Sequence, residues 1–401
     1  MVGNGFDLAH GLPTKYSDFL YFMTLCIVKL APDWRRWGAW DGINHFQLEQ
    51  SAFEHILSNT SNNKMVKKLF DENFEYVNQI SKHIDFKNFM HNDWLSYFIC
   101  IYAFRQKLNY EFQWIDIEEE LMAMLKEINN LTVTYNLEIS VLVPYRSGND
   151  KSPKPFFFKT LRKYIKTLED VPKNKLKSEV FKCLFKQLEQ LSKLLKFYLT
   201  LVCDEYHKEE KKFFKFSTNM GDKFYLSHVI SFNYTDISTV YNTQAKVYYV
   251  NGSLTDPQII LGIENPFSQE NYSYFDNDIH LFFKNVQRVL YDFQYRHNAW
   301  LSQKEHIMYK RYDGINQFDD TNRVYIVGHS LAVSDKHILL DIIESAYDVT
   351  IFYYNDSDKQ SKITNLYKIL GDDKFYRYIN NEFGSPKIIL KHQREICLSD
   401  E

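Results

Sequence analysis

The clearest hydrophobic pattern in the chain is helical and lies between positions 176 and 202. Apolar residues recur every three or four positions, as on one face of an α-helix: Leu176, Val180, Leu184, Leu188, Leu191, Leu195, Tyr198 and Val202. Neither Gly nor Pro occurs between Pro172 and Gly221, so the pattern predicts one long helix.

After Gly221 the pattern changes to short runs rich in β-branched and aromatic residues, which predict strands. The predicted strands are 226–232, 246–250, 258–261, 323–327, 349–354 and 387–390. Helical patterns over 335–345 and 358–370 separate the later runs. Strand, crossover helix, strand is the order of a parallel sheet.

The first residues form a glycine turn at Gly3 and Gly5, followed by a short helix and a break at Gly11-Leu12-Pro13. We therefore predict an α/β fold, with a Rossmann-like parallel sheet and a large helical insertion. Residues 1–20 and 222–401 are the predicted sheet domain, and residues 21–221 the insertion domain. A phosphate-binding glycine turn follows a strand, yet only two residues precede Gly3. Either that strand is missing or the natural chain begins upstream.

The composition is that of a globular protein, with 45% hydrophobic and 25% charged residues. The 401 residues favour two substructures over one core. An aromatic share of 17% indicates either large ring-filled cores or a large ligand-facing surface. The longest apolar stretch near the start, Leu20–Val28, is too short to span a bilayer. We expect a cytoplasmic protein with no membrane contact.

The distribution of charges and the spacing of the cysteines indicate which ligands the chain can bind. Residues 151–216 carry 17 Lys+Arg and 8 Asp+Glu, a local charge of +9 in a chain whose net charge is −3. The five cysteines have no metal-ligand spacing, so we expect reduced thiols and no metal: Cys26, Cys100, Cys183, Cys203 and Cys397.

Four ordered motifs carry the candidate chemistry. Glycines let backbone amides approach a phosphate, and the string GNGFDLAHGLP opens the chain. It resembles the nucleotide motif of sirtuins, which runs GAG, a short spacer, then GIP. The segment Ser231–Asp236 resembles the sirtuin TQNID segment, the pair Asn251-Gly252 stands where sirtuins carry His-Gly, and Gly328–Val333 resembles GTSLxV. The resemblance implies a sirtuin/DHS-like core.

The opening string is also similar to that of the AbiH family of bacteriophage abortive infection proteins. The segment Trp114–Glu118 resembles their W-x-D-I-E element, and FNYTD and GHSL resemble their later strands. This resemblance implies an antiphage protein that binds, and hydrolyses, NAD. The implied partners are a dinucleotide, a phage-derived protein or nucleic acid as trigger, and further copies of the chain.

The resemblance also assigns the site residues. The implied catalytic residues are Asn4, Asp7, Asn233, Asp236, Asn251 and His10. The implied cofactor-binding residues are Gly3, Asn4, Gly5, Phe6, Asp7, Asn233, Gly252, Gly328, His329 and Ser330. Sirtuins use their His as a general base, and an Asn amide takes up no proton near pH 7. We expect Asn251 to slow NAD cleavage or leave only binding, unless His10 or His329 is the base, and Asn251→His to raise turnover.

Three other interpretations stay open. Gly328–Ala332 also matches a G-x-S-x-A nucleophile elbow, and Asp356 and His392 complete the chain order of a serine hydrolase with Ser330 as nucleophile. A non-catalytic nucleotide or nucleic-acid sensor is the second, with cations and rings mixed over 207–216 and interrupted by acidic residues. The acidic residues after Trp114 form either an acid cluster or the charged first turn of a helix.

Overall fold

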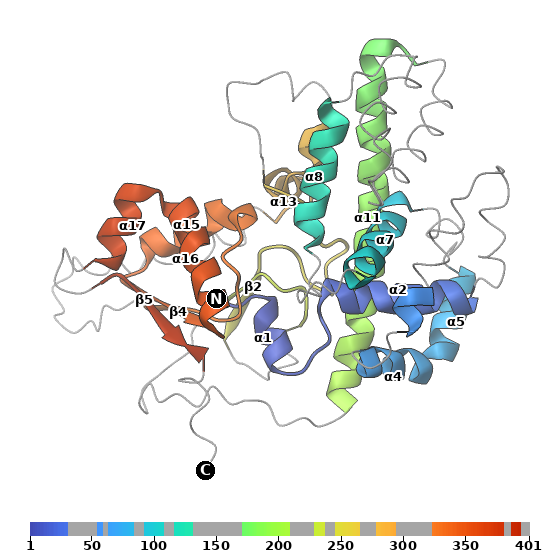
Figure 1. The fold of residues 1–401 in the computed structure, drawn as a ribbon, viewed down its shortest axis with the longest axis horizontal. Coiled ribbons are helices and arrows are strands. Elements are labelled where there is room, and N and C mark those ends of the chain that lie inside the picture. Colours follow the sequence, from blue (N-terminus) through green and yellow to red (C-terminus); the bar gives the residue numbers. More distant parts are fainter. Residues whose placement is uncertain are drawn as a thin grey trace. The chain divides into compact units, whose positions relative to one another are not determined.

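The computed structural model describes most of the chain. The described ranges are 1–30, 54–58, 63–83, 92–107, 116–130, 171–208, 228–236, 245–264, 278–293, 323–380 and 386–393. The chain divides into two compact units, shown together in Figure 1. Unit 1 comprises Met1–Leu12, Cys203–Ile260 and Arg288–Glu401, and unit 2 comprises Pro13–Val202 and Leu261–Gln287.

The strands described in unit 1 are all parallel to their neighbours. β1 (His228–Ser231) pairs with β2 (Lys246–Tyr249), and β3 (Arg323–Ile326), β4 (Asp348–Tyr353) and β5 (Ile388–His392) pair in that order. These runs match five of the six predicted strands to within two residues. The sixth prediction, 258–261, is wrong: three of its four residues are buried but the run forms no strand, and the Ile260 amide donates to the Asn251 carbonyl at 2.9 Å.

Val2 joins the two strand groups. It forms parallel bridges to Ser231, the last residue of β1, and to Val327, the residue after β3. The Val2 amide donates to Ile230 O at 3.0 Å, and the Val327 amide donates to Met1 O at 3.0 Å. The strands of unit 1 therefore follow one another as β2, β1, Val2, β3, β4, β5. Met1 and Val2 thus occupy the position between β1 and β3, directly before the glycine turn.

Alternating side chains along these strands build two apolar faces. One face carries Ile326 and Ile351 and packs against α15 (Lys336–Ser345) and α16 (Asp356–Leu370). The other carries Val229 and Val327 and packs against Phe6 of α1 (Asn4–Ala9). In Figure 1, α15, α16 and α17 (Asp372–Ile379) lie beside β4 and β5. Each face of the sheet thus carries a cluster of buried apolar side chains.

Unit 2 is helical. Its main helices are α2 (Tyr16–Leu30), α4 (Lys64–Glu72), α5 (Phe74–His83), α7 (Asp93–Lys107), α8 (Ile117–Asn130) and α11 (Lys173–Lys208, which runs on into unit 1). A 3-10 helix, η4 (Ile279–Phe282), precedes α13 (Lys284–Leu290), of which Arg288 and the residues after it belong to unit 1. The α11 helix confirms the predicted long helix, and all eight residues of its apolar pattern are buried.

Aromatic side chains fill the interior of unit 2. Ten of the eleven largest fully buried side chains of the described residues are rings, and all ten lie in this unit. Trp94 anchors α7 to α11 because its Nε1 donates to Leu184 O at 2.9 Å, while its ring stacks on Phe98. A ring-filled core therefore accounts for part of the high aromatic content.

Candidate functional site

The sequence motifs of unit 1 occupy the carboxyl ends of neighbouring parallel strands. Gly3–Asp7 follows Val2, Phe232–Asp236 follows β1, Val250–Ser253 follows β2, and Val327–Leu331 follows β3. Because the strands are parallel, these four turns lie at the same edge of the sheet. Ligands of open parallel sheets bind at this edge.

The glycines of two motifs are needed for close packing of backbone on backbone. The amide of Gly5 donates to Gly328 O at 2.8 Å, and the amide of Gly3 donates to Val327 O at 3.1 Å. A Cβ on Gly5 would lie 2.8 Å from Gly328 O, and one on Gly328 would collide with the amide nitrogen of Phe6. Gly328 also has φ +64°, a conformation that favours glycine. The Gly3 and Gly5 amides are thus committed to the protein itself.

A buried polar pair joins the first motif to the second. Asp7 is 1% exposed, and its Oδ2 accepts a 2.8 Å hydrogen bond from Thr235 Oγ1. Asn233 is also buried, and its Nδ2 donates to Gly3 O at 3.1 Å. Burial, and after it the negative charge of Asp7, raises the pKa of Cys203 to about 12. This thiol stays protonated at neutral pH and is no nucleophile.

A buried guanidinium links the third motif to Asp335, which follows the fourth motif in the sequence. Arg288 Nη2 donates to Asn251 Oδ1 at 2.8 Å and to Asp335 Oδ1 at 3.1 Å, and its Nε donates to Val250 O at 3.3 Å. Arg288, Asn251 and Asp335 are each at most 5% exposed. A charge this deeply buried needs such partners. The Asn251 amide oxygen is therefore an acceptor for a cation.

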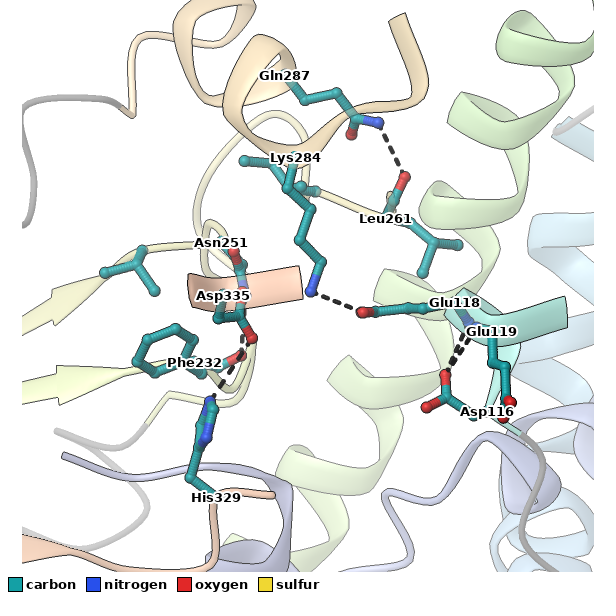
Figure 2. Close-up of polar contacts among 12 residues, drawn as sticks. Asp116, Glu118, Glu119, Phe232, Asn251, Leu261, Lys284, Gln287, His329 and Asp335 are labelled. Carbon is teal, nitrogen blue, oxygen red and sulfur yellow. Dashed lines mark hydrogen bonds and ion pairs between the residues drawn. The ribbon is translucent and has the colours of Figure 1, made fainter. Parts of the chain in front are cut away.

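His329 extends this network, and its hydrogen bonds select its tautomer. The backbone amide of Leu331 donates to His329 Nδ1 at 2.9 Å, so Nδ1 carries no proton. Nε2 lies 3.6 Å from Asp335 Oδ2, an approach that Figure 2 shows. The turn is strained, because Leu331 is buried at φ 56°. The lone pair of His329 Nδ1, which a general base would use to take up a proton, is thus occupied by the hydrogen bond that holds the strained turn.

His10 has the opposite tautomer. Its Nδ1 lies 2.8 Å from Phe6 O, an acceptor, so Nδ1 holds the proton and Nε2 has the lone pair. Burial lowers the pKa of His10, and the hydrogen bond to Phe6 O raises it in part. The half-buried ring packs against that of Phe6, with centroids 4.5 Å apart. Of the two candidate histidines, His10 is the one whose Nε2 can accept a proton.

The remaining candidate residues have varied surroundings. Asp236 Oδ1 accepts from the Tyr249 hydroxyl at 3.3 Å, and Asn4 is half-buried at the first position of α1. Gly252 has φ +83°, and a Cβ there would lie 2.8 Å from the Phe293 ring. Ser330 is exposed beside Gly328.

Comparison with known proteins identifies the family. The model of the family described as "Bacteriophage abortive infection AbiH" matches residues 1–355. The chain belongs to the AbiH family. Searches of curated proteins and of solved structures give no significant match. Membership points to an antiphage abortive infection role, and the matched range contains all four motifs together with Arg288 and Asp335.

The three residues of the alternative serine hydrolase in this AbiH protein, Ser330, Asp356 and His392, have different structural surroundings. The strained residue of the turn is Leu331, whereas a nucleophile elbow strains its serine. Asp356 is exposed at the first position of α16, and the ring of His392 packs edge-on against Tyr353, with centroids 5.3 Å apart. Asn365 Nδ2 donates to the Ser330 carbonyl at 3.0 Å.

The acidic residues of unit 2 have structural partners, as the charged-turn interpretation expects. Asp116 Oδ1 accepts from the amides of Glu118 and Glu119 at 2.9 and 3.1 Å and so caps α8. Glu118 Oε2 lies 2.8 Å from Nζ of the buried Lys284 (Figure 2), and Glu120 pairs with Arg105. Among the described residues, no group of three His, Cys, Asp or Glu side chains is placed to hold a metal.

Trp114 of the W-x-D-I-E element and most of the run 207–216 lie outside the described residues of this AbiH protein. Across the described ranges, no helix is both long and apolar enough to cross a membrane.

The AbiH site contains two residues that sequence patterns did not indicate. Arg288 pairs with Asn251 and Asp335 across 37 and 47 positions of sequence. Neither Arg288 nor Asp335 belongs to a motif, and each looks like an ordinary surface charge of a helix. The available signal was Asn251 itself, because a buried amide oxygen needs a hydrogen-bond donor.

Proposed function

We propose that this AbiH protein binds NAD at the carboxyl ends of the unit 1 strands and hydrolyses its nicotinamide bond. The order of the strands carries the proposal. Counting Val2 as the first strand, the order β2, β1, Val2, β3, β4, β5 corresponds to 3-2-1-4-5-6, the order of dinucleotide-binding Rossmann folds. In such folds the ligand binds where the order reverses, between the first and fourth strands.

The two glycine turns flank this reversal. Gly3 follows the first strand and Gly328 the fourth, and their segments are in direct backbone contact. Since the amides of Gly3 and Gly5 bond to the protein, the proposal draws ligand contacts from the Asn4 side chain and the exposed hydroxyl of Ser330. These groups suit ribose hydroxyls and phosphate oxygens.

The same turns offer groups for cleavage. When the C–N glycosidic bond breaks, nicotinamide leaves with the bonding electron pair and positive charge develops on the ribose. The carboxylate of Asp7, held by Thr235, stabilises that charge, and Asn233 orients the ribose. Water forms the new C–O bond and loses its proton to Nε2 of His10. The products are nicotinamide and ADP-ribose.

The wider role rests on the same proposal. Cleavage of NAD depletes the cofactor of an infected cell and stops phage growth. A phage-derived protein or nucleic acid triggers the activity, and further copies of the chain associate with it.

Calorimetric titration with NAD tests the binding step. Asn233→Ala removes the amide that donates to Gly3 O and should weaken NAD binding about fivefold to 150-fold, as expected for loss of about 1–3 kcal/mol. Asn380→Ala, an exposed asparagine at the end of α17, is the matched control and should bind as the wild type does. Absence of NAD binding to the wild type, or equal binding by both variants, would refute the proposal.

A further inference from the structure

The geometry points to Arg288 as the positioning residue of the proposed NAD site: its guanidinium clamps the turn after β2 to the turn after β3. This inference rests on the proposed function for its ligand, and on the contacts of Arg288 for the clamp. Arg288 itself belongs to neither turn. It comes from α13 and enters the strand-end edge of unit 1 from outside the sheet.

The planar fork of the guanidinium binds the turn after β2 directly and reaches the turn after β3 through Asp335. Nε and Nη2 bind Val250 O and Asn251 Oδ1 of one turn, while Nη2 also binds Asp335 Oδ1, beyond the other turn. A lysine has one compact charge on a flexible stem and cannot reproduce this planar arrangement. The contacts therefore fix geometry as well as balance charge.

The clamp continues through Asp335 to the strained turn. The second carboxylate oxygen of Asp335 faces His329 Nε2, and His329 Nδ1 accepts a hydrogen bond from the Leu331 amide. The His329 ring also packs against Phe232 of the turn after β1, with centroids 4.3 Å apart. Three of the four strand-end turns thus depend on one buried cation.

This arrangement assigns a role to Asn251. Its side-chain oxygen is the neutral acceptor that Arg288 requires, and its Nδ2 lies 3.5 Å from Phe232 O. Both polar ends of the amide are directed at the protein. Asn251 acts through Arg288 on the site and does not touch the reacting atoms.

A double variant separates this positioning role from a contribution to stability. Arg288→Met leaves the Asp335 carboxylate buried without its cation, so it destabilises the fold. Arg288→Met/Asp335→Leu replaces both charges by apolar side chains and should recover the thermal midpoint. A merely structural pair predicts recovery of NAD affinity as well. The clamp predicts that NAD still binds at least tenfold more weakly than to the wild type.

Hydrogen exchange supplies a readout that needs no NAD. In the double variant, peptides covering 248–254 and 327–335 should both exchange faster, whereas Ile369→Ala, a core variant in α16, should leave them protected. Arg288→Lys, which keeps the charge, should fold and show an intermediate loss.

The possible results of these experiments distinguish the clamp, the positioning role and the proposed function from one another. Unchanged protection of both turns in the double variant and in Arg288→Lys overturns the clamp, whatever NAD does. Full NAD affinity in the double variant overturns the positioning role. Faster exchange in a protein whose wild type binds no NAD supports the clamp and removes the proposed function instead.

Discussion

The hydroxyl of Thr235 donates a 2.8 Å hydrogen bond to the carboxylate of Asp7, although 228 positions separate the two residues. Both side chains are 1% exposed. The bond fixes the turn after β1 against the first helical turn of the chain. Removing its donor leaves a buried carboxylate oxygen with one partner fewer.

Thr235→Val should therefore lower the free energy of unfolding by about 1–3 kcal/mol, the usual cost of an unsatisfied buried polar group. Urea unfolding monitored by circular dichroism measures the change. Thr235→Ser keeps the hydroxyl and should lose less. Equal losses in the two variants would show that the methyl group, not the hydrogen bond, matters at this position.

Gly328→Ala should destabilise the protein by about 3 kcal/mol or more, because the added methyl meets the Phe6 backbone and φ is +64°. Gly371→Ala is the matched control: φ is +75°, but no atom lies within 4 Å of the new Cβ. It should cost about 1–2 kcal/mol, the cost of the conformation alone. Similar unfolding midpoints for the two variants would contradict the close packing of the glycine turns.

Acid stability should depend on Asp18 in unit 2. Burial raises the pKa of Asp18 to about 6 from its ordinary value of 3.8, although the Lys15 amide donates to its carboxylate at 3.1 Å. Between about pH 4 and pH 6 the folded chain holds this proton more firmly than the unfolded chain does. This contribution to stability is thus present at low pH and lost as the pH rises to about 6.

Asp18→Asn stays uncharged, so its thermal midpoint should gain on that of the wild type as the pH rises from 4 to 6, then keep a constant lead. Subtracting the two midpoint curves removes the titration of all other groups. A flat difference across this window would show that Asp18 ionises as freely in the folded state as in the unfolded state.

Asn251→His tests the nature of the base. Sequence reasoning alone expects a gain in turnover, but the Arg288 guanidinium beside position 251 changes that expectation. A neighbouring cation disfavours an imidazolium, so the new side chain should be a poor proton acceptor. Nicotinamide release should not increase, whereas Asn251→Asp, which keeps an acceptor for Arg288, should fold normally. A tenfold increase in release by Asn251→His would place the base at this position.

The sequence predicts local elements well and long-range contacts poorly. The α11 helix and five strands follow from hydrophobic spacing, because burial of one face produces that spacing directly. The strand predicted over 258–261 is wrong because a buried apolar run has the same composition whether or not it pairs with a neighbouring strand. Val2 was missed as a strand because a single residue has no periodicity. Arg288 and Asp335 escaped because their pairing depends on how distant turns meet.

The candidate site shows the same division. The motif segments indicated which turns carry polar residues, and their place at one edge follows from parallel pairing. The tautomers of His10 and His329 follow only from the neighbouring backbone groups. Of the two histidines that the sequence offers as the base, these hydrogen bonds favour His10 over His329.

The most direct test of the account is incubation of the purified protein with NAD, followed by chromatography for free nicotinamide. The wild type should release nicotinamide and ADP-ribose in equal amounts, and His329→Gln, which keeps a side-chain acceptor, should retain part of the activity. His10→Ala should lose about a hundredfold or more, the usual contribution of a general base. NAD that remains intact with the folded wild type would contradict hydrolysis, and full activity of His10→Ala would contradict the mechanism.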